Sequence, residues 1–241
     1  MNHQAQSVRQ DAILVVPTLN RYDGLLRLVQ SVEQGSVLPR EYLVIDNGGS
    51  LIDFLRAENK PLPRGRTRIV VPGKNMGVAA SWNLGLERGE ELTILAADDC
   101  TVEANTLIEL FNMADSMPNE GFFSPMTQNP NHSEWSFFMQ RKSLVDHVGL
   151  YDEVFWPGYF EDDDYRRRML LSGFVPCRPK AARIKHIGGA TSTQFDRKTL
   201  FQSNLDRYVA KWGGQVGRER VSRPANPIVR EKMADAKMVL V

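Results

Sequence analysis

Cysteine is scarce in this chain of 241 residues, which contains only Cys100 and Cys177. The two lie far apart in the sequence, and neither belongs to a Cys-x-x-Cys pair. A disulfide framework needs several cysteine pairs, and a structural zinc site of the common type needs closely spaced ligands. The sequence therefore argues against both as the basis of the fold, and it favours a reducing compartment.

Long apolar runs and an excess of charge of one sign are also missing. No stretch approaches the roughly 20 apolar residues that span a bilayer, and residues 1–10 lack the apolar segment of a signal peptide. Lysine and arginine total 30 against 29 acidic residues, so the net charge of +1 gives no overall attraction to nucleic acid or to an anionic membrane. We therefore expect a cytoplasmic protein without a transmembrane segment.

The glycine-rich phosphate loops of several nucleotide-binding enzymes are absent as well. After the first apolar run the chain reads PTLNRYDG, which matches neither GxGxxG nor GxxxxGK[ST]. Those patterns place phosphates on backbone N–H groups at a helix start. Dinucleotide-dependent oxidoreductases and P-loop enzymes are therefore set aside. A nucleotidyltransferase, which generally has such a loop here too, remains only a weak alternative.

Short β-branched runs alternate with helix-like stretches through the first half of the chain. Within residues 25–32, apolar residues recur at the spacing of an amphipathic helix, and residues 75–88 and 105–114 are two further expected helices. Strands joined by helices form a mostly parallel sheet, so the predicted fold class is α/β. The expected strands are residues 12–17, 42–46, 68–71 and 92–96.

Polar residues follow three of these predicted strands. The first strand is followed by Thr18, Asn20 and Arg21, the second ends in Asp46 and Asn47, and the fourth runs into Asp98 and Asp99. Ligands of open parallel sheets bind beyond the carboxyl ends of the strands. We therefore expect one crevice to collect these side chains.

Asp98 and Asp99 are adjacent carboxylates, and a divalent cation would relieve their repulsion. Mg²⁺ or Mn²⁺ held by one or two carboxylates and by diphosphate oxygens is the usual arrangement for phosphorylated substrates. A solvated turn in which an aspartate caps the next helix is the competing interpretation.

A run of four acids, residues 161–164, opens another predicted helix. The helix macrodipole favours acids there, but their mutual repulsion also raises pKa values toward the range of a general base. Asp162 and Arg166 stand at i, i+4, so a helix-surface ion pair is a competing role for that aspartate. His186 follows a short strand-like run and precedes two glycines, and it is either an ordinary histidine or a metal ligand.

The order of motifs along the chain resembles that of family 2 glycosyltransferases with the GT-A fold, including the inverting rhamnosyl- and galactofuranosyltransferase-like members. This resemblance implies a single Rossmann-like nucleotide-binding domain with an acceptor-side extension over residues 12–214. Residues 1–11 would be an N-terminal extension and residues 215–241 a basic tail. The motifs are VVPTLNR, VIDNGG, KNMGVAASWNLGL, LAADDCTV, MQRKSLVDHVGLYDEVF, YFEDDDYRRRM, KHIGGAT and YVAKWGG.

The resemblance also implies a donor site and a metal site. Asp99 and His186 would hold Mn²⁺ or Mg²⁺, and Ala97 stands where the family usually has its first acid. Asp46 would bind the edge of the base, and a UDP-sugar is the favoured donor. The donor-binding residues implied are Pro17, Thr18, Asn20, Arg21, Asp46, Asn75, Gly77 and Asp98.

The same resemblance implies an inverting transfer in which Asp162 is the general base. Glu161 and Trp135 would face the acceptor, although core packing is an equal alternative for Trp135. The acceptor would be a hydroxyl of a saccharide, a protein or a modified nucleobase, and the chain is a candidate homo-oligomer. A nucleotide-sugar-binding module that has lost its chemistry is the alternative function.

Overall fold

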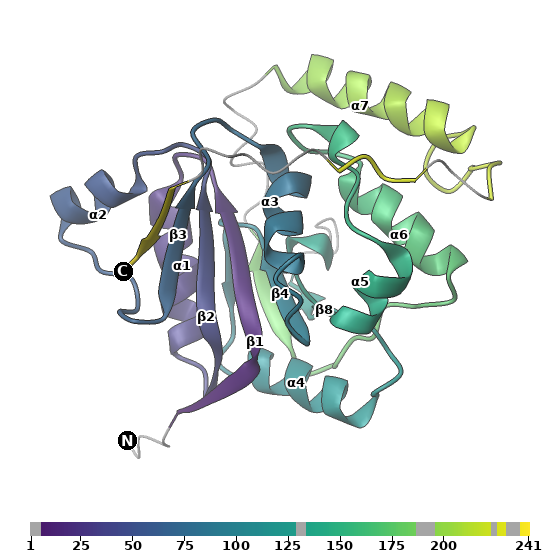
Figure 1. Cartoon of the computed structure of the whole chain (residues 1–241). Coiled ribbons are helices and arrows are strands. Elements are labelled where there is room, and N and C mark those ends of the chain that lie inside the picture. The colour runs from purple at the N-terminus through teal and green to yellow at the C-terminus, as the bar shows by residue number, and fades with distance from the viewer. Residues whose placement is uncertain (1–5, 129–133, 187–195, 223–225, 230–236) are drawn as a thin grey trace.

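A sheet of seven strands forms the centre of the structure (Figure 1). This computed structural model describes residues 6–128, 134–186, 196–222, 226–229 and 237–241. Neighbouring strands among β1 to β4 pair in parallel, whereas β10, β8 and β6 pair with their neighbours in antiparallel fashion. In spatial order the strands are β10 (Lys237–Leu240), β3 (Thr67–Val71), β2 (Val37–Asp46), β1 (Ser7–Thr18), β4 (Leu92–Ala96), β8 (Phe137–Arg141) and β6 (Phe122–Phe123).

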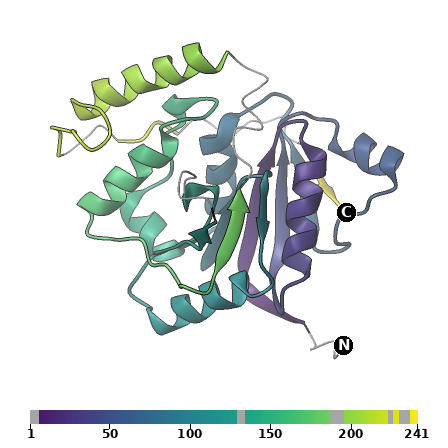
Figure 2. The ribbon, with the colours of Figure 1, turned by 180° about the vertical axis from the view of Figure 1, so that it is seen from behind.

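Helices cover both faces of this sheet. Successive residues of each central strand point to opposite faces, so each strand contributes side chains to an apolar core on both sides. Leu14 and Val16 of β1 contribute to the core under α1 (Tyr22–Glu33), α2 (Leu51–Glu58) and α4 (Thr106–Ser116). Ile13 and Val15 contribute to the core under α3 (Gly77–Leu86), α5 (Lys142–Val148) and α6 (Glu161–Leu171). Figure 2 shows α1 in front of the sheet, on the face opposite α3.

A smaller sheet lies beside the large one and is ordered β5-β9-β7. Its strands are β5 (Cys100–Val102), β9 (Arg183–His186) and β7 (Met126–Thr127). The antiparallel pairing of β5 with β9 sets Cys100 directly opposite His186. The residues that follow β4 are thereby joined to a segment far along the chain.

Helix α7 (Arg197–Trp212) packs over the start of α6, as Figure 1 shows. Asp196 caps its first turn and accepts hydrogen bonds from the backbone N–H groups of Lys198 and Thr199. Tyr208 and Trp212 are fully buried and form a third apolar cluster with Phe155 and Phe160. This cluster fixes one side of the site described below.

The α/β class with a mostly parallel sheet is confirmed, and the predicted strands and helices are all present. Strand β1 begins at Ser7, before the predicted residue 12, because residues 7–9 pair with residues 37–39 of β2 ahead of a register shift. Strand β10 adds the end of the expected tail to the sheet. Among the described residues, no helix has the length and apolar character to cross a membrane.

Candidate active site

A pocket of about 740 Å³ opens beyond the carboxyl ends of β1, β2 and β4. Its opposite wall is formed by the start of α6 and by α7, so residues far apart in the sequence meet across it. The lining residues are Pro17, Thr18, Leu19, Asn47, Asn75, Gly77, Val78, Trp82, Ala97, Asp98, Asp99, Pro157, Gly158, Tyr159, Phe160, Glu161, Asp162, Asp163, His186, Leu200, Phe201, Leu205, Gln215 and Val216.

The floor of the pocket is polar and begins with Thr18 at the end of β1. The Thr18 hydroxyl donates a hydrogen bond of 2.7 Å to Oδ2 of Asp98, which follows β4. Asp98 is almost fully buried, and burial raises its pKa to about 7 even though this hydrogen bond favours the charged form. A cation or a hydrogen-bond donor from a ligand would therefore stabilise its carboxylate.

Asp99 and His186 lie side by side on this floor. Nε2 of His186 is 2.9 Å from Oδ1 of Asp99. Cys100 lies close by, because one ligand atom from each of Asp99, Cys100 and His186 falls within 4.8 Å of the others. Carboxylate oxygen and imidazole nitrogen at this separation are a donor set that fits a divalent cation.

The loop from β3 to α3 forms one rim of the pocket. Asn47 holds this loop, since its Oδ1 accepts a 2.9 Å hydrogen bond from the N–H of Met76. Gly77 has φ +82°, and a Cβ there would lie 2.9 Å from Cδ1 of Trp156, so only glycine fits without strain. The Trp156 indole N–H donates to the carbonyl of Asn75 at 3.0 Å. The rim is thus tied to the segment that precedes α6.

The acids at the start of α6 have different surroundings. Glu161 is buried, and burial together with the charge of Asp162 holds its pKa well above the usual range. Burial also raises the pKa of Asp162, and it raises that of Asp163 to about 7 with help from the charge of Asp162. All three line the pocket, and a raised pKa makes each of these carboxylates a stronger base than an ordinary one.

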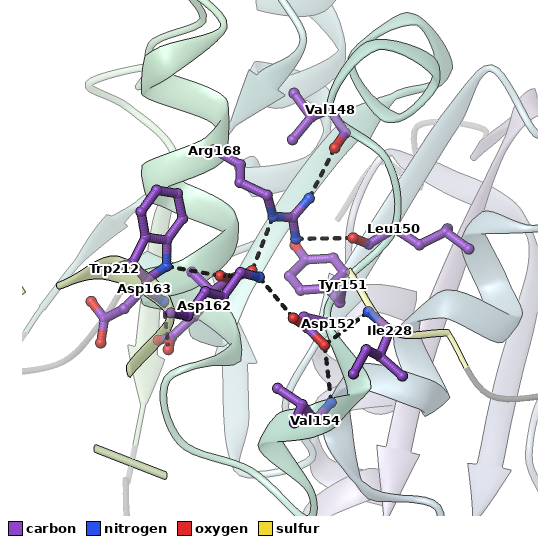
Figure 3. A network of polar contacts seen from close by, with 12 residues as sticks. Val148, Leu150, Tyr151, Asp152, Val154, Asp162, Asp163, Arg168, Trp212 and Ile228 are labelled. Atoms are coloured by element: carbon purple, nitrogen blue, oxygen red, sulfur yellow. Dashed lines mark hydrogen bonds and ion pairs between the residues drawn. The ribbon is translucent and has the colours of Figure 1, made fainter. Parts of the chain in front are cut away.

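Asp164 differs from these three because it points into a buried network and does not line the pocket. Its carboxylate lies 3.0 Å from Nε of Arg168 and 2.6 Å from Nζ of Lys211, and it accepts a 2.9 Å bond from the indole N–H of Trp212. Figure 3 shows this network, in which Arg168 also donates to two carbonyls and Asp152 joins the backbone of Ile228. Asp164 therefore fastens α6 to α7.

The α7 part of the opposite wall is apolar and is built around Phe201, whose surface is 47% exposed. Its ring lies 4.9 Å from that of Phe160 and 5.7 Å from that of Tyr159. Nδ2 of Asn204 donates to the carbonyls of Phe155 and Gly158 at 3.1 and 2.7 Å. These bonds hold the segment before α6 against α7.

Most of the predicted site residues meet in this pocket, but four do not line it. Asp46 is buried, and its carboxylate accepts bonds from the N–H groups of Gly48, Gly49 and Leu51 and from the Tyr22 hydroxyl. It therefore fixes the turn after β2. The predicted residues that line the pocket are Pro17, Thr18, Asn75, Gly77, Asp98, Asp99, Glu161, Asp162 and His186.

Asn20, Arg21 and Trp135 are the other three predicted residues that do not line the pocket. The Asn20 side chain accepts a 3.3 Å bond from the Tyr22 hydroxyl, and Arg21 precedes α1, where its charge lowers the pKa of Asp98 against the larger effect of burial. Trp135 is buried in an aromatic cluster, with its ring 4.5 Å from Phe122 and 5.0 Å from Phe138. Of its two predicted roles, core packing is the one that this position fits.

Asn47 lines the pocket, as expected from its place at the polar end of the second predicted strand, although the resemblance pointed to Asp46 and not to Asn47 as a binding residue. Other lining residues were not predicted. Trp82 lies within the motif KNMGVAASWNLGL, where nothing distinguishes it from a core residue. The α7 residues and Gln215 have no local pattern that marks them, because only tertiary packing brings them to the site.

Comparisons with known proteins agree with this architecture. The sequence model described as Glycosyl transferase family 2 matches residues 13–177. Among solved structures, a mannosyltransferase from Pyrobaculum calidifontis in complex with GDP-Man and Mn²⁺ superposes with a TM-score of 0.62 at 14% identity, over 86% of this chain and 66% of that one. GalNAc-T7 with UDP, GalNAc and Mn²⁺ also gives 0.62, at 13% identity, over 88% of this chain and 49% of that one.

At these identities the two structures establish the fold, which is the GT-A fold of glycosyltransferases. The chain spans about two thirds and one half of their respective lengths. No significant match was found among the curated proteins.

Proposed function

The chain belongs to glycosyl transferase family 2, and from this premise we propose that it transfers a sugar from a nucleoside diphosphate to a hydroxyl acceptor, with inversion and with a bound divalent metal. The observation that carries the proposal is the arrangement of the pocket. Asp98, Asp99 and His186 lie at the strand ends, and Asp162 lines the same pocket from the start of α6.

The donor would occupy the strand-end half of the pocket. Pro17, Thr18, Asn75 and Gly77 form its walls there, and Asp46 supports them by fixing the turn beside Asn47. The bound GDP-Man and UDP of the two similar structures support a nucleotide-sugar donor. A UDP-sugar is our first candidate.

Asp99 and His186 would hold Mn²⁺ or Mg²⁺. The 2.9 Å approach of their ligand atoms supports this assignment, since a cation can insert where a carboxylate and an imidazole already converge. When bound, the metal would supply positive charge for the departing diphosphate. Ala97 leaves this set without the acid that the family usually adds, so Asp99 would be the main carboxylate ligand.

Asp162 would act as the general base. Its carboxylate takes the proton of the acceptor hydroxyl while that oxygen bonds to the anomeric carbon. The bond from that carbon to the diphosphate oxygen breaks, and the diphosphate leaves with the electron pair, which inverts the configuration. Burial raises the pKa of Asp162, which supports this role because a carboxylate with a higher pKa is a stronger base.

The acceptor would enter between the acids and the apolar wall of α7. Glu161 lies next to Asp162 in the lining and is our candidate for contacting it, while Phe201 offers an exposed aromatic face. An aromatic face of this kind suits the apolar C–H surface of a sugar ring as well as other apolar groups.

The test combines donor turnover with ligand binding. Wild-type protein is incubated with a panel of UDP-, GDP-, dTDP- and CMP-sugars with and without Mn²⁺, and hydrolysis or transfer is followed by nucleotide release. Asp162→Asn is expected to lower turnover at least ~100-fold, as for the loss of a general base. Calorimetric nucleotide binding should stay unchanged, because Asp162 lies across the pocket from the donor residues.

Asp163→Asn is the matched control, since it removes the adjacent acid of the same lining. A large loss in Asp163→Asn with normal turnover in Asp162→Asn would move the base to Asp163. Nucleotide binding by the wild type without turnover of any donor would instead favour a module that has lost its chemistry.

A further inference from the structure

Cys100 is placed beside the candidate metal ligands by the pairing of two distant strands. It directly follows Asp99 in the chain, and the β5–β9 register sets it opposite His186. Residues directly opposite in an antiparallel pair project to the same side of the sheet. The thiol therefore lies with the carboxylate and the imidazole, all within 4.8 Å of one another.

The thiol is positioned by the surrounding core. Cys100 is almost fully buried, and its Sγ donates a 3.2 Å hydrogen bond to the carbonyl of Ser136. Asp99 and His186 line the pocket, whereas Cys100 is buried and does not. Because one ligand atom of each of the three residues lies within 4.8 Å of the others, a cation that enters from the pocket between the two lining residues would also be within reach of the sulfur.

These three donors differ from an all-oxygen site in the metals that they favour. Thiolates select soft or borderline cations such as Zn²⁺, whereas carboxylates and water suit Mg²⁺ and Mn²⁺. Zinc sites with three protein ligands from cysteine, histidine and carboxylate groups leave a fourth position open for water or a ligand. Here that open position would face the pocket.

We propose that Asp99, Cys100 and His186 together form a thiolate-containing site that binds Zn²⁺ in preference to Mn²⁺ or Mg²⁺. When the metal binds, the thiol releases its proton to the solvent, the hydrogen bond to Ser136 is lost and a metal–sulfur bond forms. Because Asp99 and His186 are also the ligands named in the proposed function, Zn²⁺ competes there with the metal that supports transfer. The inference rests on the proposed function only in this shared use of two residues.

Co²⁺ provides a direct readout, because a thiolate bound to Co²⁺ gives a charge-transfer absorption in the near ultraviolet that oxygen and nitrogen ligands do not give. We expect the wild-type protein, titrated with Co²⁺ under anaerobic conditions, to show this band and to lose it on addition of Zn²⁺. The Cys100→Ser variant should lack the band. Cys177→Ser is the matched control: Cys177 is the only other cysteine of the chain and lies outside the cluster, so this variant should keep the band.

Calorimetric titrations with Zn²⁺ and with Mn²⁺ complete the test. Cys100→Ser should weaken Zn²⁺ binding at least about tenfold, because loss of a residue that only supports a metal ligand already costs about tenfold or more in metal affinity. The affinity for Mn²⁺ should change little. Absence of the Co²⁺ band in the wild type, or equal Zn²⁺ affinity in wild type and Cys100→Ser, would overturn the proposal. The band is measured on unaltered protein, so a folding defect of the variant cannot hide a negative result.

The same experiments separate this proposal from the transferase function. If Asp99→Asn abolishes Mn²⁺-dependent nucleotide binding but the Co²⁺ band is absent from wild type, the proposed transferase metal site is supported and the proposal that Cys100 is a ligand is refuted. If the band is present but no nucleotide binds, the thiolate-containing metal site is supported and the proposed transferase function is refuted.

Discussion

Replacing Asp164 with Asn would remove the carboxylate that both Arg168 and Lys211 contact inside the protein. Asp164 is fully buried, so solvent does not screen these interactions. The variant leaves two buried cations facing a neutral amide. Removing one partner of a buried ion pair typically costs about 3–5 kcal/mol, because the remaining charge is left uncompensated.

The surrounding contacts place Asp164→Asn at the lower end of this range. Arg168 still donates to the carbonyls of Val148 and Leu150, each at 2.9 Å, and Lys211 keeps a 2.7 Å contact with Asp152. The amide oxygen of Asn can also still accept from the Trp212 indole. We therefore expect the free energy of unfolding to fall by about 3 kcal/mol. At about 2–4 °C per kcal/mol for a chain of this size, the Tm should fall by about 6–12 °C.

Urea unfolding followed by far-ultraviolet circular dichroism measures this change. Asp206→Asn on α7 is the control, because Asp206 is exposed and should change the free energy of unfolding by less than about 0.5 kcal/mol. A loss below about 1 kcal/mol in Asp164→Asn, which is what a surface ion pair contributes, would refute the idea that this network fastens α6 to α7.

Two further predictions concern Asp163 of the acid run and Phe201 of α7. Burial raises the pKa of Asp163 to about 7, above the ordinary aspartate value of about 3.9. Between about pH 4 and about pH 7, the folded state therefore holds a proton on Asp163 that the unfolded state has lost. Wild-type stability should therefore fall, relative to Asp163→Asn, as the pH rises from about 4 to about 7 in urea titrations; parallel pH profiles would contradict this. For Phe201→Ala, the KM for whichever hydroxyl acceptor supports transfer should rise about fivefold with the donor KM unchanged, since covering the exposed half of the ring is worth about 1 kcal/mol. An unchanged acceptor KM in steady-state kinetics would remove Phe201 from the acceptor site.

The central strands could be predicted from sequence because burial on both faces of a parallel sheet demands continuous apolar runs. The strand-end residues Asp98 and Asp99 were predicted for the same reason, since the carboxyl ends of parallel strands converge. Strands β6 and β7 have two residues each, which is too short to leave a pattern. Strand β10 was not predicted, because its strand structure depends on pairing with the distant strand β3.

Side-chain direction explains why some predicted site residues do not line the pocket. Asp46 ends strand β2, and Asp98 and Asp99 lie just beyond the end of strand β4. The Asp46 carboxylate, however, accepts hydrogen bonds from three backbone N–H groups of the turn that follows it. The run of four acids shows the same limit. Successive helix residues point about 100° apart, so Asp162 and Asp163 face the pocket while Asp164 faces α7. The sequence shows four carboxylates but not these directions.

The pairing of β10 with β3 has a consequence for how the protein is made. Strand β3 is synthesised early, whereas β10 leaves the ribosome long after it, yet β10 supplies the backbone partners along the outer edge of β3. Until then this edge displays unpaired N–H and C=O groups to other nascent chains. Completion of the sheet must therefore wait for residues 237–240, and in this interval the chain is most open to association with its own copies.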